Sequence, residues 1–284
     1  MAKRKINRPS PREFLIKRFL GLHLGGAKTD NTVVAVLEYY PKHKKVFLSR
    51  IHLGLGGKKD KSADLVLHEL LTIGESPIDL LSMDAPLSLP KCIICELKCP
   101  GYEKCGEPEI KWMWNWFKKH GKQKKPPRQF VPYTQRCTEL HVASEYEKAF
   151  HPPEALGSNM APLASRAQFI LRRIKVPTIE VYPELSLWRI GQKLDISKSM
   201  FNFHKHSVEG ESNRLQIIKK IVDSGLVFVY DQDIKVLSQT PAAFDAFICG
   251  LTAYIHDIGG SEDRPKGFPK KESWLTFPKE NFTF

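Results

Sequence analysis

The chain has 284 residues, enough for one large domain with insertions or for two small domains. Apolar residues make up 42% of it and charged residues 26%, which is typical of a globular protein with a buried core, and no stretch approaches the roughly 20 apolar residues of a membrane-spanning helix. Lysine and arginine number 44 against 31 acidic residues, a formal charge of +13 that makes nucleic acid the first partner to consider.

Residues 1–17 are predicted to form a basic, flexible arm. The arm has two prolines and one acid, and its six cations are Lys3, Arg4, Lys5, Arg8, Arg12 and Lys17. Such a segment can become ordered on a polyanion or can act simply as a solubilising tail. Lys17 and Arg18 interrupt the only apolar run that could be the core of a signal peptide, so we expect a cytoplasmic protein without membrane association.

Residues 18–87 have the pattern of a mixed α/β sheet. Strands joined by two short turns, which suit an antiparallel meander, are predicted at 19–24, 32–39 and 45–53. A helix at 62–73 with Ser62 as its N-cap follows, and then a continuous apolar strand at 78–83. Three strands, a helix and a buried strand are the opening order of a ribonuclease-H-like sheet flanked by helices.

Residues 88–130 interrupt this pattern with cysteines, tryptophans and lysines. We interpret them as a cysteine-rich insertion in a domain that spans residues 18–258. After the insertion we expect a strand at 178–182, and helices at 160–173, 211–224 and 241–256. Residues 259–284, rich in Pro, Lys and Phe, are expected to be a tail that wraps the surface.

Three acidic residues lie in or directly after predicted core elements. Asp84 follows the apolar strand and stands at its carboxyl end, where α/β sheets place ligands, although it could equally cap the turn before Pro86. Glu180 lies inside an otherwise apolar strand, unless that strand is an edge whose acid faces solvent. Asp245 has small and apolar neighbours in the last helix, where a lone carboxylate needs a cation or a salt-bridge partner.

Carboxylates held together by rigid elements are what metal-dependent phosphodiester hydrolysis requires. Two cations about 4 Å apart activate water and stabilise the leaving oxygen, and hard Mg²⁺ or Mn²⁺ prefers oxygen ligands. Asp84, Glu180 and Asp245 are therefore the predicted ligands of a divalent cation.

Five short motifs occur in order along the chain, at residues 21–26, 83–87, 132–136, 180–184 and 244–246. Together they resemble the family called domain of unknown function 429, a family of predicted nucleases with a ribonuclease-H-like fold. The resemblance implies that Asp84, Glu180 and Asp245 bind the metal ion. It also places His23 where the family has Asp, which implies a nuclease with altered metal preference, or a degenerate site that binds without cutting.

Four cysteines lie within fourteen residues in the insertion, at Cys92, Cys95, Cys99 and Cys105. Four thiolates suit tetrahedral Zn²⁺, and a bound metal would order a loop too small to have its own core. An iron–sulfur cluster is the rival, and two local disulfides are disfavoured in the cytoplasm. Cys137 and Cys249 are expected to be ordinary residues.

Aromatic and basic residues follow the cysteines, and no acid occurs between Glu109 and Glu139. We expect Trp112, Trp114 and Trp116 to pack the insertion against the sheet, although aromatic faces could instead stack on unpaired bases. His204 and His206 are expected to be surface histidines. The cations predicted to contact nucleic-acid phosphates are Lys118, Lys119, Lys122, Lys124, Lys125, Arg128, Arg136 and Arg166.

The leading functional hypothesis is a nuclease that hydrolyses DNA or RNA by in-line attack of metal-activated water. Asp84, Glu180 and Asp245 would hold Mg²⁺ or Mn²⁺, and His23 would be an atypical ligand or a proton-transfer group. The alternative is a catalytically degenerate nucleic-acid-binding protein on the same fold. A phosphotransferase is a third possibility, because one fold supports several reactions.

Overall fold

The computed structural model describes residues 15–26, 31–57, 60–73, 77–124, 128–146 and 150–283. Residues 1–14, most of the predicted arm, lie outside this set. The described strands form one mixed sheet in the order β3-β2-β1-β4-β5-β6. They are β1 (Lys17–His23), β2 (Val33–Tyr40), β3 (Lys45–His52), β4 (Leu80–Met83), β5 (Thr178–Val181) and β6 (Leu275–Thr276).

The predicted antiparallel meander is confirmed. β2 pairs antiparallel with both β1 and β3, and their bounds differ from the predicted ones by at most two residues. The helix predicted next is α1 (Ala63–Thr72), and Ser62 is its N-cap, with its side chain accepting a hydrogen bond of 3.2 Å from the backbone N–H of Leu65. β4, β5 and β6 then extend the sheet from β1, each parallel to its neighbour.

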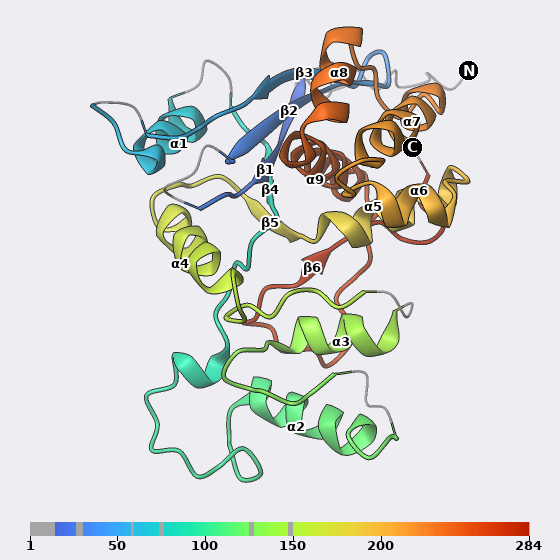
Figure 1. Ribbon diagram of the computed structural model, residues 1–284. Helices are drawn as coiled ribbons and strands as arrows, with labels where there is room; N and C mark the ends of the chain where they lie inside the picture. The colour runs from blue at the N-terminus through green and yellow to red at the C-terminus, as the bar shows by residue number, and fades with distance from the viewer. Residues whose placement is uncertain are drawn as a thin grey trace, which may run out of the picture.

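Helices cover both faces of the sheet (Figure 1). The alternation of side chains along β1 explains why, because Leu20 and Leu22 face one apolar cluster and Phe19 faces the other. The first cluster is covered by α1 and α4 (Met160–Leu171). The second is covered by the buried helix α9 (Pro241–Asp257), with α5 (Pro183–Lys193), α6 (Lys198–Phe203), α7 (Gly210–Asp223) and α8 (Asp231–Gln239) around it.

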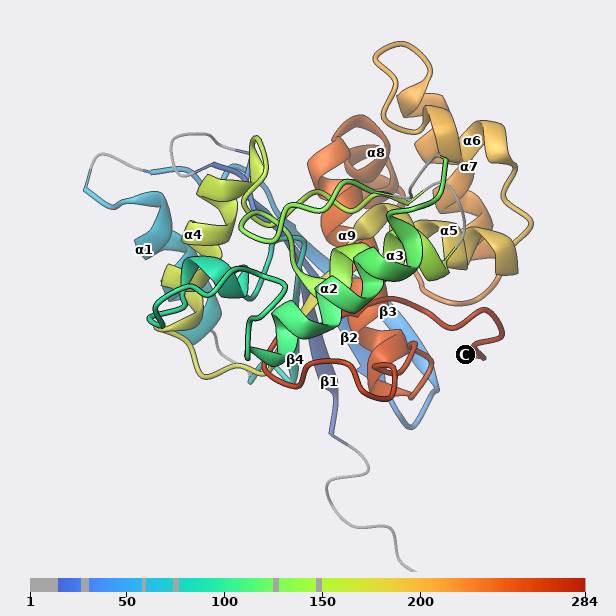
Figure 2. The ribbon, with the colours of Figure 1, turned by 90° about the horizontal axis from the view of Figure 1, so that it is seen from below.

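The chain between β4 and α4 forms a lower part below the sheet (Figures 1 and 2). It contains a short 3-10 turn (Lys91–Ile93) and the helices α2 (Pro108–His120) and α3 (Cys137–Glu145). Most cysteines and tryptophans of the sequence lie in this part. The exceptions are Cys249 in α9, Trp188 in α5 and Trp274 in the C-terminal segment.

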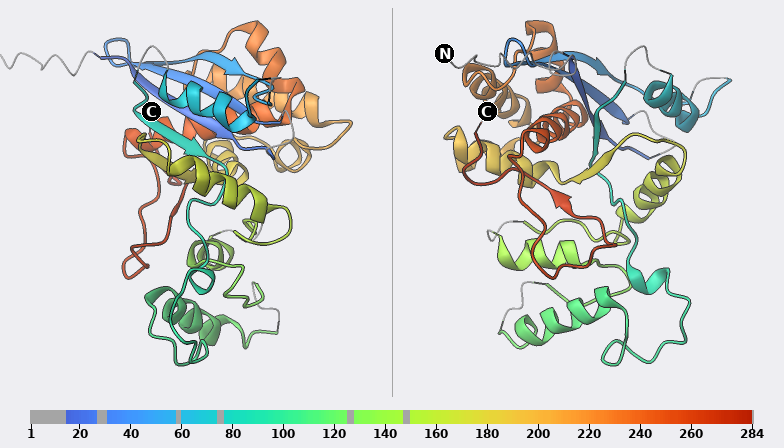
Figure 3. Two further views of the ribbon diagram at one scale, coloured as in Figure 1. Left: turned by 90° about the vertical axis from the view of Figure 1, so that its left-hand side faces the viewer. Right: turned by 180° about the vertical axis from the view of Figure 1, so that it is seen from behind.

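The C-terminal segment, expected to wrap the surface, also supplies the sixth strand of the sheet (Figure 3). Its carboxylate Glu272 accepts hydrogen bonds from the backbone N–H groups of Cys137 (3.0 Å) and Thr138 (2.7 Å), at the start of α3. Trp274 and Phe277 are buried beside it. The segment therefore ties the lower part to the sheet.

Several elements carry no clear sequence signal. β6 is two residues long, too short for a periodic pattern. Helix α5 begins at Pro183, a residue that also marks the end of a strand, and its apolar residues are buried on several sides. No helix of the described residues is both long and apolar enough to cross a membrane.

Candidate active site

The candidate site lies where the carboxyl ends of parallel strands meet. His23 is the last residue of β1, and Asp84 directly follows β4. Leu22 pairs with Met83 in the parallel register, and the backbone N–H of Asp84 donates to the carbonyl of Leu22 (3.2 Å). The next side chains on the two strands, His23 and Asp84, therefore emerge next to each other.

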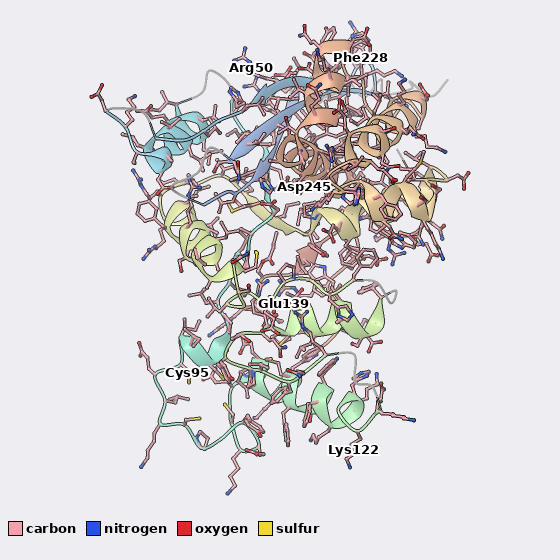
Figure 4. All side chains as sticks on the ribbon, viewed as in Figure 1. Arg50, Cys95, Lys122, Glu139, Phe228 and Asp245 are labelled. Carbon is pink, nitrogen blue, oxygen red and sulfur yellow. The ribbon has the colours of Figure 1, made fainter. Side chains whose placement is uncertain are left out.

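Two glycines allow α9 to bring a third group to this point. A methyl group on Gly21 would overlap the backbone of α9 at Ala246 and Gly250, and one on Gly250 would overlap Leu37. Because both positions lack a side chain, α9 packs directly on β1. The packing places Asp245, from the second turn of α9, where this helix meets the strand ends (Figure 4).

The three side chains are close enough to share a ligand. His23 Nδ1 lies 2.5 Å from Asp84 Oδ2 and 4.0 Å from Asp245 Oδ2. One donor atom from each residue lies within 4.8 Å of the others, and among the described residues this is the one such group of three or more potential metal ligands. The second oxygen of Asp84 is fixed by the backbone N–H of Leu24 (2.8 Å).

His23 carries a proton at neutral pH. Burial disfavours the imidazolium, but the charge of Asp84, its hydrogen bond and the charge of Asp245 outweigh burial and raise the pKa of His23 to about 9. Burial also raises the pKa of Asp245, although Lys205 and His23 oppose that effect. A metal ion that used the Nδ1 atom of His23 would have to replace this proton.

A lysine that the sequence analysis did not select completes the charge balance. Lys205 Nζ lies 3.0 Å from Asp245 Oδ2 and 3.1 Å from Glu184 Oε1. Burial opposes its charge, but Asp245 and Glu184 raise the pKa of Lys205 above its usual value. Tyr182 donates to the other oxygen of Glu184 (2.7 Å), so Glu184 is held from two sides.

Glu180, predicted as a metal ligand, lies apart from this group and forms an ion pair. Arg136 donates to its two oxygens at 2.6 and 2.8 Å, and the backbone N–H of Leu87 donates at 2.8 Å. Arg136 also pairs with Glu139 (2.9 Å), and all three ionic side chains are buried. Burial opposes the charge of Arg136, but Glu180 and Glu139 keep its pKa well above the usual value. The guanidinium is thus a buried counter-ion of the two glutamates, and the predicted phosphate contact of Arg136 stays a prediction.

These residues line one open pocket of about 230 Å³. Its polar wall contains the His23, Asp84 and Asp245 group together with Lys205 and Glu184, and Glu180 and Arg136 form a second polar region. Pro152, Pro153 and Leu163 are among the apolar residues that line it. The carboxylates of this pocket can bind a small cation, and Lys205 can bind a negatively charged polar group beside that cation.

A family model described as "Protein of unknown function (DUF429)" matches residues 49–271. The chain belongs to the DUF429 family. The match includes Asp84, Glu184, Lys205 and Asp245, whereas His23 precedes it. Searches of curated proteins and of solved structures found no match.

The other predicted phosphate contacts of the DUF429 chain fall into two groups. Arg166 is buried, where it donates to Asp64 (2.7 Å) and to the carbonyl of Gly25 (2.5 Å), and the partly buried Arg128 donates to the carbonyl of Pro152 (2.7 Å). The burial of Arg166 does not fit the predicted surface role. The exposed cations lie at or just after the end of α2 and are Lys118, Lys119, Lys122 and Lys124.

This lysine cluster is separate from the candidate site. Figure 4 shows Lys122 at the end of the lower part, with Glu139 between it and Asp245. Lys119 has an acidic partner, Glu145, at 3.3 Å. Lys125 lies outside the described residues. The cluster could bind a polyanion only as a surface of its own or along an extended strand that also reached the pocket.

The tryptophans of the DUF429 chain pack, as expected, but against α3 and the C-terminal segment. Trp116 is buried and donates to Ser144 in α3 (2.9 Å). Trp112 meets the ring of Phe268 edge-on, and Trp114 stacks on Phe117. His204, expected at the surface, is buried. Its burial anchors the backbone next to Lys205 in an otherwise exposed segment.

The four clustered cysteines are free thiols on the wall of one hollow. Burial and the three neighbouring thiols raise the pKa of Cys92. The sulfur atoms are more widely spaced than the donor atoms around His23, because no three of them lie within 4.8 Å of one another. Cys137 and Cys249 are buried elsewhere, as expected of ordinary core residues.

Proposed function

We propose that this protein is a metal-dependent nuclease with a ribonuclease-H-like fold. The observation that carries the proposal is the convergence of His23, Asp84 and Asp245 in an open pocket at the carboxyl ends of parallel strands. Three potential ligands from three separate elements meet there, which is the arrangement that a catalytic cation requires.

The sheet supports the fold assignment. An antiparallel meander of β1, β2 and β3 is extended on the β1 side by parallel β4 and β5, and α1 connects the two halves. This is the order expected for a ribonuclease-H-like sheet. In this assignment the cysteine-bearing residues 88–130 are an insertion between β4 and α4, and β6 is an addition at the far edge.

The donor set fits one divalent cation that accepts nitrogen as well as oxygen. His23, Asp84 and Asp245 offer one imidazole and two carboxylates, which suit Mn²⁺ better than Mg²⁺. When bound, the cation would supply the Lewis acid that polarises a phosphate and activates water. Leu24 holds the orientation of Asp84 through its backbone N–H (2.8 Å).

Lys205 supplies the positive charge that a second cation would otherwise bring. Its ammonium lies between Asp245 and Glu184, 3.0 and 3.1 Å from their oxygens. Glu180, the remaining acid of the predicted set, is neutralised by Arg136. The described residues therefore offer ligands for one metal ion beside a fixed ammonium, rather than ligands for two metal ions.

A nuclease assay tests the proposal. We expect the chelator-treated full-length chain, given Mn²⁺, to cleave labelled single- or double-stranded DNA or RNA. Asp84→Asn and Asp245→Asn should lose cleavage to the level of the metal-free control, because each removes a ligand charge. Asp223→Asn, at an exposed position of α7, is the matched control and should keep full activity. Cleavage that survives in Asp84→Asn would contradict the site assignment.

A second candidate function is nucleic-acid binding without cleavage. The observation that favours it is that His23 and Lys205 already neutralise the two acids of the site. In that case the natural chain should not cleave nucleic acid with any metal ion. His23→Asp, which adds a third acid to the site, should then gain cleavage activity. Binding should weaken steeply with added salt, because the net charge of +13 favours phosphate contacts.

A further inference from the structure

We infer that Cys92, Cys95, Cys99 and Cys105 form a four-thiolate zinc site that holds residues 88–107 in place. All four side chains line one hollow of about 350 Å³, and none of them is in a disulfide. Glu107 and Ile110, at the start of α2, form another part of its wall. The inference is independent of the proposed nuclease site, and Figure 4 shows Cys95 in the lower part, well away from Asp245.

The segment itself needs such a support. Between residues 88 and 107 the only regular element is the 3-10 turn Lys91–Ile93. Ile93, Ile94 and Leu97 are 54%, 53% and 63% exposed, so apolar burial contributes little to ordering this stretch. A metal bound by four points of the segment supplies the missing constraint.

The chemistry of the donors selects zinc. Four thiolates within fourteen residues are soft ligands that suit a closed tetrahedral Zn²⁺ site. In such a site the sulfur atoms stand about 3.8 Å apart, from Zn–S bonds of about 2.3 Å. No three of the thiol sulfurs here lie within 4.8 Å of one another, so binding requires some of them to move inward. Apart from the 3-10 turn that contains Cys92, the segment has no helix or strand to resist that movement.

The charges around the hollow are mixed: Glu107 lines it, and burial and the neighbouring thiols raise the pKa of Cys92, but several lysines lie nearby. Lys98 lines the hollow, and Lys104 directly precedes Cys105. Lys91 lies 3.1 Å from Glu107, at the N-terminus of α2. Zinc with four thiolates carries a net charge of two minus, which nearby ammonium groups stabilise. Cys105 lies two residues before the N-cap of α2, so the site would also fix the beginning of that helix.

Metal analysis of the full-length wild-type chain, purified under reducing conditions without chelator, is the decisive measurement. We expect one zinc per chain, with X-ray absorption showing four sulfur neighbours at about 2.3 Å. Asp84→Asn should retain this zinc, which separates the cysteine site from the candidate active site. Zinc with only nitrogen and oxygen neighbours, iron with acid-labile sulfide, or four free thiols with no metal would each overturn the inference.

Variants locate the ligands. Cys95→Ser and Cys99→Ser should lose the zinc, whereas Cys249→Ala, which changes a cysteine buried in α9, should keep it. Hydrogen exchange on the wild-type chain avoids the question of whether a variant folds. Removal of zinc should accelerate exchange in residues 91–107 and leave β1, β2 and β4 protected. Equal exchange in residues 91–107 with and without zinc would show that no metal holds the segment.

Discussion

The ion pair between His23 and Asp84 predicts a pH dependence of stability that a single substitution should remove. The structure raises the pKa of His23 from 6.5 to about 9. The native state therefore binds this proton more tightly than the unfolded chain does. The resulting stabilisation is fully present below pH 6.5 and is lost as the pH rises through about 9.

The size of the effect follows from the two pKa values. Each pKa unit corresponds to 1.36 kcal/mol, so the shift contributes about 3 kcal/mol to the free energy of unfolding. His23→Asn is the test variant, because its neutral amide nitrogen can still donate to Asp84. Urea unfolding of both chains with chelator present, from about pH 6 to about pH 10, gives the free energies.

The quantity to follow is the difference in unfolding free energy between wild type and His23→Asn. Other groups, cysteines included, titrate in both proteins and cancel from this difference. We expect the difference to fall by about 3 kcal/mol across the range, with most of the change between pH 6.5 and about 9. A difference that stays constant would refute the assignment of His23 as an imidazolium bound to Asp84.

Three further predictions follow from the site and its supports. If His23 is a metal ligand, Mn²⁺ affinity measured by calorimetry should rise about tenfold per pH unit until about pH 9, whereas a pH-independent affinity would leave His23 a proton-transfer group. Gly21→Ala should lower the free energy of unfolding by about 3 kcal/mol or more, because the added methyl group would overlap the backbone of α9. The control is Gly106→Ala, whose methyl group would lie in open space and should change the free energy of unfolding by less than about 0.5 kcal/mol. Equal effects of the two substitutions would contradict the close packing of α9 on β1. Arg136→Met should lower the free energy of unfolding, measured with urea, by about 3–5 kcal/mol, because it leaves Glu180 and Glu139 unpaired. The control Arg50→Met, at an exposed position, should lower it by less than about 0.5 kcal/mol. A similarly small decrease for Arg136→Met would mean that these ion pairs contribute little to stability.

The parts of the fold that the sequence predicts well are those with local signals. Alternating apolar residues mark the meander, and Ser62 marks the start of α1 by a hydrogen bond within three residues. The place of Asp84 after an apolar strand is a local signal, whereas His23 is indicated only by the family resemblance, and the parallel pairing of β1 with β4 brings the two together. Asp245 could be selected since a buried helix rarely tolerates an unpaired carboxylate.

The parts that could not be predicted depend on contacts between distant residues. Glu180 and Arg136 are 44 positions apart, and nothing local distinguishes a paired acid from a metal ligand. The gap in acidic residues before Arg136 suggested a free cation, but Glu139, three residues later in α3, and Glu180, from β5, both pair with it. Lys205 lies between two histidines and reaches Asp245 only because α6 packs against α5 and α7. Glu184 lies within the motif at residues 180–184. Its position after Pro183, at the start of α5, is the one local signal that could have marked it as a site residue.

The position of β6 has a consequence for how the molecule is assembled during synthesis. Residues 272–276 are synthesised after the other strands of the described sheet, yet Glu272 accepts hydrogen bonds at the start of α3 and β6 pairs with β5. Leu275 also lines the pocket of the candidate site. The part of the pocket wall that Leu275 forms is therefore added after the central strands, so a nascent chain that has already formed those strands lacks a completed pocket until this segment docks.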